Sequence, residues 1–338
     1  MSDSILREPA PEALFSRFRV DIRPPDRKTV ATAMSRVTDR IRFHSGGEAL
    51  LTLFETHPAV KTFLEGVFSN SPYLTELAAR DTARLVRILT HDPAELVDRL
   101  VAEVDASRLD DEAELMRRLR LAKQEVALAA ALADLGGVWG TLEVTGALTR
   151  IGDATLQAAA RFCLADAARR GKIELPNPAD PAEGSGWILL AMGKYGAHEL
   201  NYSSDIDLIV FFDRDVARLA DPPEATDLFV KMTKRLVKIM QERTADGYVF
   251  RTDLRLRPDP GATPIAMGLD AAFQYYESMG QNWERAALIK ARPAAGDLKA
   301  GWGFVSEIRP FIWRKYFDYA AIADVHSIKR QIHAHKGH

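Results

Sequence analysis

The sequence contains a single cysteine and almost no net charge. Cys163 has no partner for an internal disulfide, which is typical of a reducing compartment. It lies in the helical pattern "LQAAARFCLADAARR", which indicates a small core residue rather than a nucleophile. The net charge of -2 excludes a global basic field that would attract nucleic acid or an anionic membrane. Any phosphate chemistry must therefore come from a local site.

Long hydrophobic runs and a targeting segment are also missing. No apolar run reaches the roughly 18 residues that a membrane span needs. Residues 1–27 are polar and contain prolines, unlike a signal peptide. With 338 residues, 47% of them hydrophobic, the chain can bury a substantial core, and we expect about two or three domains. These features predict a soluble cytoplasmic protein that binds neither membrane nor nucleic acid.

The first half of the chain has a helical pattern. Residues 1–40 are weakly patterned and predict a loose N-terminal arm with one short helix. Residues 41–171 carry apolar residues at three- and four-residue spacing and predict a helical region, to which no chemistry can be assigned. Helix boundaries are indicated at Pro58, at Asp92 with Pro93 as N-cap and first helical residue, at Gly136-Gly137, and at Gly171.

The pattern changes in residues 172–297. A loop at 172–186 precedes two short apolar runs, "WILLAM" (187–192) and "LIVFF" (208–212), which predict buried strands. An amphipathic helix follows from Pro222 to about Thr244, with an apolar stripe formed by Leu228, Met232, Leu236, Ile239 and Met240. Residues 248–258, "YVFRTDLRLRP", alternate strictly and predict a third strand. Helices are expected from there to the end.

This order of elements predicts an α+β fold. A small sheet with one long helix forms the core over 172–297, and the N-terminal helical region packs beside it. Residues 298–338 are expected to begin a C-terminal helical domain.

Two carboxylates stand where the second strand begins, in "NYSSDIDLIVFF". Asp205 and Asp207 are two positions apart, so on a strand they point to the same side. Adjacent carboxylates stay ionised only beside a cation. Mg²⁺ is the expected ion, with Mn²⁺ as a possible substitute, because it prefers carboxylate and phosphate oxygens.

The third predicted strand adds an acid between arginines. One face would present Arg251, Asp253, Arg255 and Arg257. Asp253 would supply a third metal ligand, and the three arginines would hold phosphates.

A glycine turn leaves the first predicted strand in "MGKYGAHELNYSSD". Gly193 and Gly196 allow the backbone to approach a phosphate closely, and Lys194 and Ser204 are further candidate contacts. The glycine-lysine pair lacks the remaining residues of a P-loop, so that interpretation is rejected. A strand, a glycine turn, an Asp-x-Asp pair and a later Asp form the layout of a two-metal nucleotidyl-transfer site. Further along, Arg285, Lys290 and Arg292 are either solvated or turned toward the phosphates.

These motifs resemble a known family. "MGKYGAHELNYSSDIDLIVFF", "RTDLRLRPDPG" and "YYESMGQNWERAALIKARPAAGD" are similar to the N-terminal half of the bifunctional glutamine synthetase adenylyltransferase/deadenylylase family, within the DNA polymerase beta-like nucleotidyltransferase superfamily. The resemblance covers nearly the whole chain from about Arg42.

The resemblance implies a nucleotidyltransferase in the regulation of nitrogen assimilation. In this half, AMP is removed from a glutamine synthetase tyrosine by phosphorolysis, and ADP is released. Glutamine synthetase, the PII signal-transduction protein, phosphate and ADP or ATP are the implied partners. Asp205, Asp207 and Asp253 match the metal-binding acids, and Gly193 to Gly196 match the phosphate-binding turn, where Lys194 replaces a frequent serine.

Two alternatives remain open from the sequence. The same site can transfer AMP from ATP to glutamine synthetase. The chain can also be an inactive docking module for glutamine synthetase or PII, because family members are far longer and the chain is expected to be a truncated piece of one.

Overall fold

The computed structural model describes residues 12–39, 46–108, 110–313 and 330. The chain forms two compact units. Unit 1 comprises Met1–Val104 and Leu121–Ile151, and unit 2 comprises Asp105–Arg120 and Gly152–His338. The two long helices α7 (Glu112–Leu135) and α8 (Thr141–Arg169) each contribute residues to both units.

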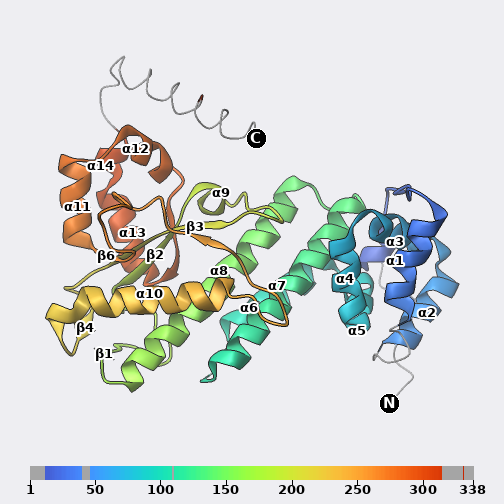
Figure 1. The fold of residues 1–338 in the computed structure, drawn as a ribbon, viewed down its shortest axis with the longest axis horizontal. Helices are drawn as coiled ribbons and strands as arrows, with labels where there is room; N and C mark the ends of the chain where they lie inside the picture. The colour runs from blue at the N-terminus through green and yellow to red at the C-terminus, as the bar shows by residue number, and fades with distance from the viewer. Residues whose placement is uncertain (1–11, 40–45, 109, 314–329, 331–338) are drawn as a thin grey trace. The chain divides into compact units, whose positions relative to one another are not determined.

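The described part of unit 1 consists of helices joined by loops and contains no strand (Figure 1). Besides its shares of α7 and α8 it contains η1 (Leu14–Arg17), α1 (Arg27–Thr38), α2 (Gly47–Thr56), α3 (Pro58–Asn70), α4 (Pro72–Arg80), α5 (Thr82–Thr90) and α6 (Pro93–Asp105). The N-terminal arm, expected to contain one short helix, contains η1 and the 12-residue α1, which buries Ala33, Met34 and Val37. Its N-cap is Asp26, whose carboxylate accepts a hydrogen bond from the Thr29 amide.

The helix boundaries predicted in this region are confirmed. Helix α3 begins at Pro58, and α7 ends one residue before the Gly136-Gly137 pair. The Asp92 carboxylate accepts hydrogen bonds from the amides of Ala94 and Glu95, which caps α6. Gly171, at φ +65°, follows the end of α8 in the left-handed conformation that glycine adopts without strain.

Unit 2 contains the mixed sheet that holds the candidate site. Its strands run in the order β5-β3-β2-β7, and β6 also pairs with β3. Strand β2 is antiparallel to β3 and β7, whereas β5 and β6 are parallel to β3. The strands are β2 (Trp187–Ala191), β3 (Ile206–Phe212), β5 (Thr252–Asp253), β6 (Met267–Gly268) and β7 (Arg292–Gly296). The expected α+β fold and its first two strands are confirmed.

Helices and a small ribbon complete unit 2. The helices are α9 (Gly193–Gly196), η3 (Pro222–Glu224), α10 (Ala225–Gln241), α11 (Leu269–Ser278), α12 (Asn282–Leu288), α13 (Leu298–Glu307) and α14 (Arg309–Ile312). Strands β1 (Ile173–Glu174) and β4 (Arg218–Leu219) pair antiparallel apart from the main sheet. The expectation that 298–338 begins a helical domain falls partly outside the described residues; within them, α13 and α14 are helical.

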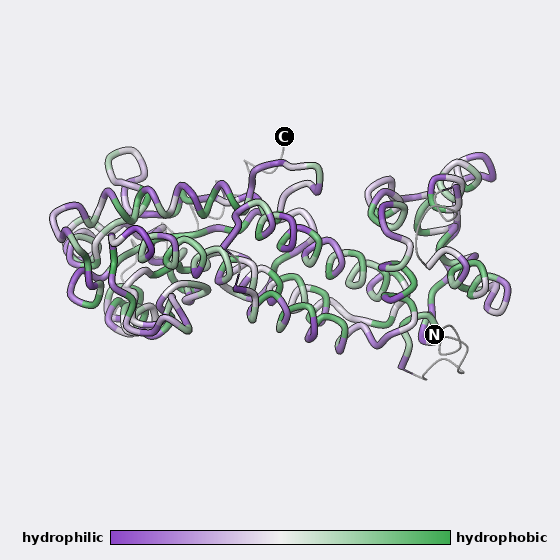
Figure 2. Tube along the Cα trace, turned by 90° about the horizontal axis from the view of Figure 1, so that it is seen from below, coloured by the Kyte–Doolittle hydropathy of each residue, from purple (hydrophilic) through white to green (hydrophobic). Residues whose placement is uncertain are grey.

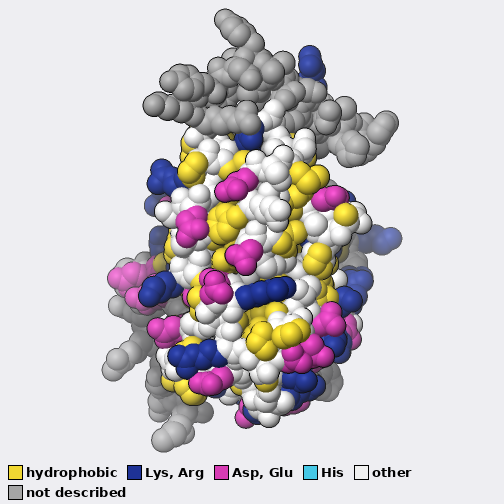
Figure 3. Space-filling view, turned by 90° about the vertical axis from the view of Figure 1, so that its left-hand side faces the viewer, with side chains coloured by type: hydrophobic (Ala, Val, Ile, Leu, Met, Phe, Trp, Pro, Cys, Tyr) yellow, Lys and Arg dark blue, Asp and Glu magenta, His cyan; other side chains and the backbone are white. Residues whose placement is uncertain are grey.

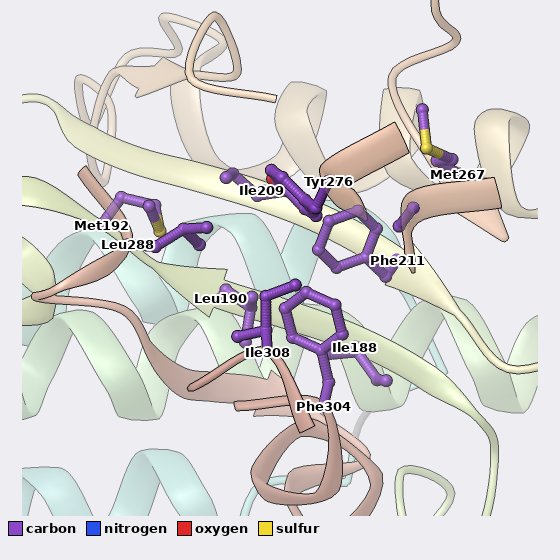
Figure 4. Close-up of a cluster of buried hydrophobic side chains, with 11 residues drawn as sticks. Ile188, Leu190, Met192, Ile209, Phe211, Met267, Tyr276, Leu288, Phe304 and Ile308 are labelled. Carbon is purple, nitrogen blue, oxygen red and sulfur yellow. The ribbon is translucent and has the colours of Figure 1, made fainter. Parts of the chain in front are cut away.

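Each face of the sheet is covered by helices, because its central strands are apolar on both faces. On one face a cluster of buried side chains packs under the helices after β6 (Figure 4); its members are Ile188, Leu190, Met192, Ile209, Phe211, Met267, Ala272, Tyr276, Leu288, Phe304 and Ile308. On the other face Phe229 of α10 stacks on Phe212, with ring centroids 4.6 Å apart, and lies near Trp187. Burying each of these large side chains contributes roughly 1.5–3 kcal/mol.

The predicted third strand at 248–258 is wrong, since only Thr252 and Asp253 form a strand. The amides of Val249 and Phe250 donate to the Met240 carbonyl at the end of α10, which holds the chain away from the sheet. The strand then ends because the Asp253 carboxylate accepts a hydrogen bond from the Arg255 amide in an Asx turn.

Strand β7 was not expected, because "WERAALIKARP" reads as a helix to its end. It lies at the sheet edge, where Pro293, which has no amide hydrogen to donate, is tolerated beside a register shift between Leu189 and Leu190.

The surface agrees with the composition. In Figure 2 the colour of the long helices changes within single turns, as amphipathic helices require. On the end of unit 2 drawn in Figure 3, basic and acidic side chains are scattered among hydrophobic ones, so the coloured side chains there form no extended field of one sign. A search of the described residues finds no helix with the length and apolarity needed to cross a membrane.

Candidate active site

The three candidate carboxylates lie at the beginning of β3. Asp207 is the second residue of β3, and its register partner in the parallel pairing with β5 is Asp253. Register partners in neighbouring strands are about 4.8 Å apart and point to the same face. Asp205 precedes the strand, so the expected alternation along one strand does not include it. The sheet nevertheless brings all three acids together.

The three acids influence one another electrostatically. The pKa of Asp207 is raised to about 6, first by burial and then by the carboxylates of Asp253 and Asp205. On β3, Asp207 shares its face with Ile209 and Phe211, so one side of its surroundings is the hydrophobic cluster. A carboxylate in this position repels its neighbours unless positive charge is supplied.

Two arginines supply positive charge to the flanking acids. Nε of Arg251 donates to Oδ1 of Asp205 at 2.5 Å, and Nη2 donates to the Ser203 carbonyl. Arg255 forms a fork on Asp253, with Nε 2.9 Å and Nη2 2.5 Å from Oδ2. The hydrogen bonds from Arg255 lower the pKa of Asp253. The Arg255 side chain is 84% exposed, so its outer surface faces solvent and can meet an anion.

The glycine turn leads into α9 and touches Asp207 directly. The Met192 amide donates to the Asp207 carbonyl at 2.9 Å, and Gly193 follows with φ +56°. An ideal Cβ on Gly193 would lie 2.7 Å from Oδ2 of Asp207, closer than real Cβ atoms come. Glycine is therefore required here both by the backbone conformation and by the approach of the carboxylate.

The other residues predicted for the turn have different surroundings. Gly196 is buried, and a Cβ there would lie 2.0 Å from the Lys290 carbonyl oxygen, so packing explains this glycine. Lys194 is exposed on α9. Ser204 lies beside Asp205 and donates its hydroxyl to Oδ1 of Asn201 at 2.7 Å. Lys194 and Ser204 remain predictions as phosphate contacts.

Arg257 has a different role from the one the alternating pattern suggested. The chain turns after Asp253, so the shared face of acids and arginines expected on a long strand does not form. The Arg257 guanidinium donates to the backbone carbonyls of Leu254, Pro260 and Thr263. It therefore braces the turn that follows β5, and the structure uses these donors within the loop.

The basic residues near β7, expected to be either solvated or turned toward the phosphates, have partners other than Asp205, Asp207 and Asp253. Lys290 pairs with Glu199 at 2.8 Å, and the Arg285 guanidinium lies 4.5 Å from the ring centroid of Phe311. Arg292 is 12% exposed and pairs with Asp153 of α8 at 2.8 Å. Sequence reasoning missed Asp153, because the partners are far apart in the chain and no local spacing connects them.

The donor chemistry of the three acids fits Mg²⁺ or Mn²⁺. They offer hard carboxylate oxygens, and their mutual repulsion, seen in the raised pKa of Asp207, is what a divalent ion would relieve. Within the described chain, no group of three or more His, Cys, Asp or Glu side chains converges closely enough to hold an ion in its present arrangement. Binding would require Asp205 and Asp253 to reorient from their arginines, so the metal assignment stays a prediction.

Comparison with known proteins gives one consistent result. A family model described as glutamate-ammonia ligase adenylyltransferase matches residues 61–306. A protein of Agrobacterium fabrum, named bifunctional glutamine synthetase adenylyltransferase/adenylyl-removing enzyme, is 52% identical over 298 residues, which cover 86% of this chain and 30% of the relative. Relatives of the same name occur in Xanthobacter autotrophicus, with 49% identity over 93% of this chain and 32% of the relative, and in Mesorhizobium japonicum, with 54% over 83% and 29%.

The chain thus spans about a third of the length of the curated relatives it matches. The resemblance inferred from the motifs is confirmed across most of the chain. With the family model covering residues 61–306, this chain belongs to the glutamate-ammonia ligase adenylyltransferase family, whose named members are nucleotidyltransferase enzymes.

Proposed function

We propose that this chain removes AMP from adenylylated glutamine synthetase by Mg²⁺-dependent phosphorolysis. The observation that carries the proposal is the register pairing of Asp207 with Asp253, with Asp205 beside them and Gly193 against the Asp207 carboxylate. Three clustered acids at a glycine turn suit transfer of a nucleotidyl group better than a docking role. The relatives' name includes the adenylyl-removing activity, which supports the same reaction here.

The proposed reaction is an in-line displacement at the AMP phosphorus. An oxygen of inorganic phosphate forms a bond to that phosphorus, the bond from phosphorus to the tyrosine oxygen breaks, and ADP leaves. The tyrosine oxygen takes up a proton and is restored as the free phenol. No other reactant is needed for the balance.

The chain's own residues have distinct parts in this scheme. Asp205, Asp207 and Asp253 would hold Mg²⁺, which supplies neutralisation of the phosphate charge when bound. Arg255 is exposed beside Asp253 and orients the incoming phosphate, and Arg251 does the same next to Asp205. Gly193, which has no Cβ, lets the backbone of the turn lie directly against the Asp207 carboxylate.

The direction of transfer depends on the resemblance to the adenylyl-removing half. Transfer of AMP from ATP is the second candidate, because the relatives' name also includes adenylyltransferase and one site can serve both directions. The PII protein as partner and the cytoplasm as compartment are proposed on the same resemblance.

A paired assay tests the proposal. One reaction contains glutamine synthetase carrying labelled AMP, with phosphate and Mg²⁺; the other contains unmodified glutamine synthetase and labelled ATP. We expect labelled ADP in the first reaction, and its loss in Asp207→Asn. The matched control is Asp213→Asn, just beyond the other end of β3, where the carboxylate accepts hydrogen bonds from the amides of Asp215 and Val216.

Each other outcome has a defined meaning. Label transfer from ATP, with no phosphate-dependent release, would reverse the direction. No reaction in either tube, with binding of glutamine synthetase retained, would support the docking module instead.

A further inference from the structure

A partly buried ion pair between Arg292 and Asp153 contacts the short helix α9. Arg292, the first residue of β7, donates from Nη2 to Oδ1 of Asp153 at 2.8 Å. The same nitrogen donates to the carbonyl oxygen of Tyr195 at 3.2 Å, and Tyr195 is the third residue of α9. The side chains of Arg292 and Asp153 are 12% and 28% exposed, so solvent screens this pair less than a surface pair.

Tyr195 is enclosed by the same two elements. Its side chain is fully buried, and the Arg292 guanidinium lies 5.3 Å from its ring centroid. On the α8 side, an ideal Cβ at Gly152 would lie 3.1 Å from Cε2 of the Tyr195 ring, so glycine gives the ring its space. Burial, followed by the Asp153 carboxylate, raises the pKa of Tyr195.

The backbone around β7 reinforces this position. The Lys290 carbonyl lies so close to Gly196 that a Cβ there would be 2.0 Å away, and Lys290 also pairs with Glu199 just after α9. The segment 290–292 therefore contacts the C-terminal part of α9 and the residues just after it. At its other side the turn presents Gly193 to the Asp207 carboxylate.

We propose that Arg292, oriented by Asp153, is a positioning residue that fixes α9 so that Gly193 stays against Asp207. Arg292 acts through Tyr195 and the α9 backbone and does not itself contact the reacting groups. For its effect on catalysis this inference rests on the proposed function, since a displaced turn would misplace the phosphate relative to the carboxylates. A misplacement of about 1 Å can lower a rate on the order of a hundredfold.

The first experiment is independent of activity. Amide hydrogen exchange is measured on the full chain for Arg292→Gln, Arg292→Lys and Asp153→Asn. Removing a charge-assisted bond should accelerate exchange of the Gly196 and Ala197 amides roughly tenfold or more. Exchange in β2 and β3 should not change, and Arg292→Lys, which keeps the charge, should give an intermediate result.

The matched control is Arg150→Gln. Arg150 also lies on α8, three positions before Asp153, and it pairs with Asp98 at 2.6 Å with both side chains well exposed. This variant removes an ion pair of the same helix that does not reach α9, so exchange of the Gly196 and Ala197 amides should stay as in the wild type. The double variant Asp153→Asn with Arg292→Gln should resemble Arg292→Gln alone, because Asp153 acts through Arg292.

The second experiment measures kcat for ADP release per folded molecule at saturating phosphate. We expect a decrease of about 10- to 100-fold in Arg292→Gln, partial recovery in Arg292→Lys, and no change in Arg150→Gln. Unchanged α9 exchange, or acceleration spread evenly through the sheet, would overturn the inference, since Arg292 would then be a general stabilising residue. Local acceleration in a chain whose wild type releases no ADP would support the positioning role and reject the proposed function.

Discussion

Asp207 and Asp253 are register partners across β3 and β5, yet their pKa values shift in opposite directions. Burial and the neighbouring carboxylates raise the pKa of Asp207 to about 6, whereas the hydrogen bonds from Arg255 lower that of Asp253. Two adjacent acids on one sheet edge should therefore respond oppositely to substitution.

Replacing Asp207 by Asn should stabilise the metal-free chain at pH 8. The pKa of Asp207 is about 6 in the folded chain and has its ordinary value of 3.8 in the unfolded chain. Between pH 3.8 and about pH 6, the folded chain therefore binds more protons than the unfolded chain. The free energy of unfolding therefore falls as pH rises through this range, and at higher pH the full cost of the ionised Asp207 carboxylate remains. In EDTA, the Tm of Asp207→Asn should exceed that of the wild type at pH 8, and the difference should disappear near pH 4.

Asp253→Asn provides the control of opposite sign. The pKa of Asp253 is lower in the folded chain than its ordinary value of 3.8, so the ionised carboxylate stabilises the folded chain at pH values above 3.8. This contribution is lost as pH falls below 3.8 through the lowered pKa of the folded chain. The variant should therefore melt below the wild type at pH 8. A rise in Tm for both variants would contradict the opposite pKa shifts of Asp207 and Asp253.

Mg²⁺ should stabilise the wild type and should do so much less in variants of its carboxylates. An ion that binds only the folded chain raises Tm with its concentration. Asp205→Asn or Asp207→Asn should reduce the affinity at least about tenfold, measured by thermal shift or calorimetry with Mg²⁺ and Mn²⁺. The control is Asp213→Asn; equal binding by all four chains would remove the metal from this site.

The two arginines after Asp253 should separate stability from activity. Arg257→Gln removes donors to three backbone carbonyls and should cost about 2 kcal/mol in urea unfolding. Arg255→Gln removes an exposed partner and should change stability far less than Arg257→Gln does, while ADP release falls. A stable, inactive Arg257→Gln would instead show that Arg257 contacts phosphate.

Gly193→Ala should cost more stability than the left-handed backbone alone explains. Gly171, at φ +65°, has nothing within 4 Å of an added Cβ, so Gly171→Ala reports only the backbone strain, about 1 kcal/mol. Gly193 has a similar φ of +56° but meets Asp207 at 2.7 Å. Urea unfolding of both variants should therefore show the larger loss for Gly193→Ala, together with weaker Mg²⁺ binding. Equal losses would mean that the carboxylate moves aside freely.

Local sequence patterns predicted the parts of the site that local physics determines. The apolar runs at 187–192 and 208–212 fit buried strands. Gly193 directly follows the first run and Asp207 directly precedes the second, so the strand assignment also places these two residues. On α10 the predicted stripe is nearly right: Met232, Leu236, Ile239 and Met240 are buried, but Phe229 is buried where Leu228 was expected. Propensity and periodicity are sufficient for such elements.

What failed depended on contacts between distant residues. Alternation at 248–258 predicted a strand. Amides that would pair with a neighbouring strand instead donate to the Met240 carbonyl and to the Asp253 carboxylate. Strand β7 was hidden because the helical pattern continues through its first two residues, Arg292 and Pro293. Arg292 was assigned no partner because Asp153 lies on α8, far from it in the sequence. None of these interactions has a signature in a short window.

Two short, separate strands, β5 and β6, pair with the same edge of β3, one at each end of that strand. Strand β5 pairs with Ile206 and Asp207, and β6 pairs with Phe211 and Phe212, while residues 254–266 leave the edge and return to it. A connection whose ends are both anchored to one strand can change length at small entropic cost and leave the anchors in register. Over evolution, insertions in 254–266 can thus alter what reaches the carboxylates, while the pairing of Asp207 with Asp253 is inherited unchanged.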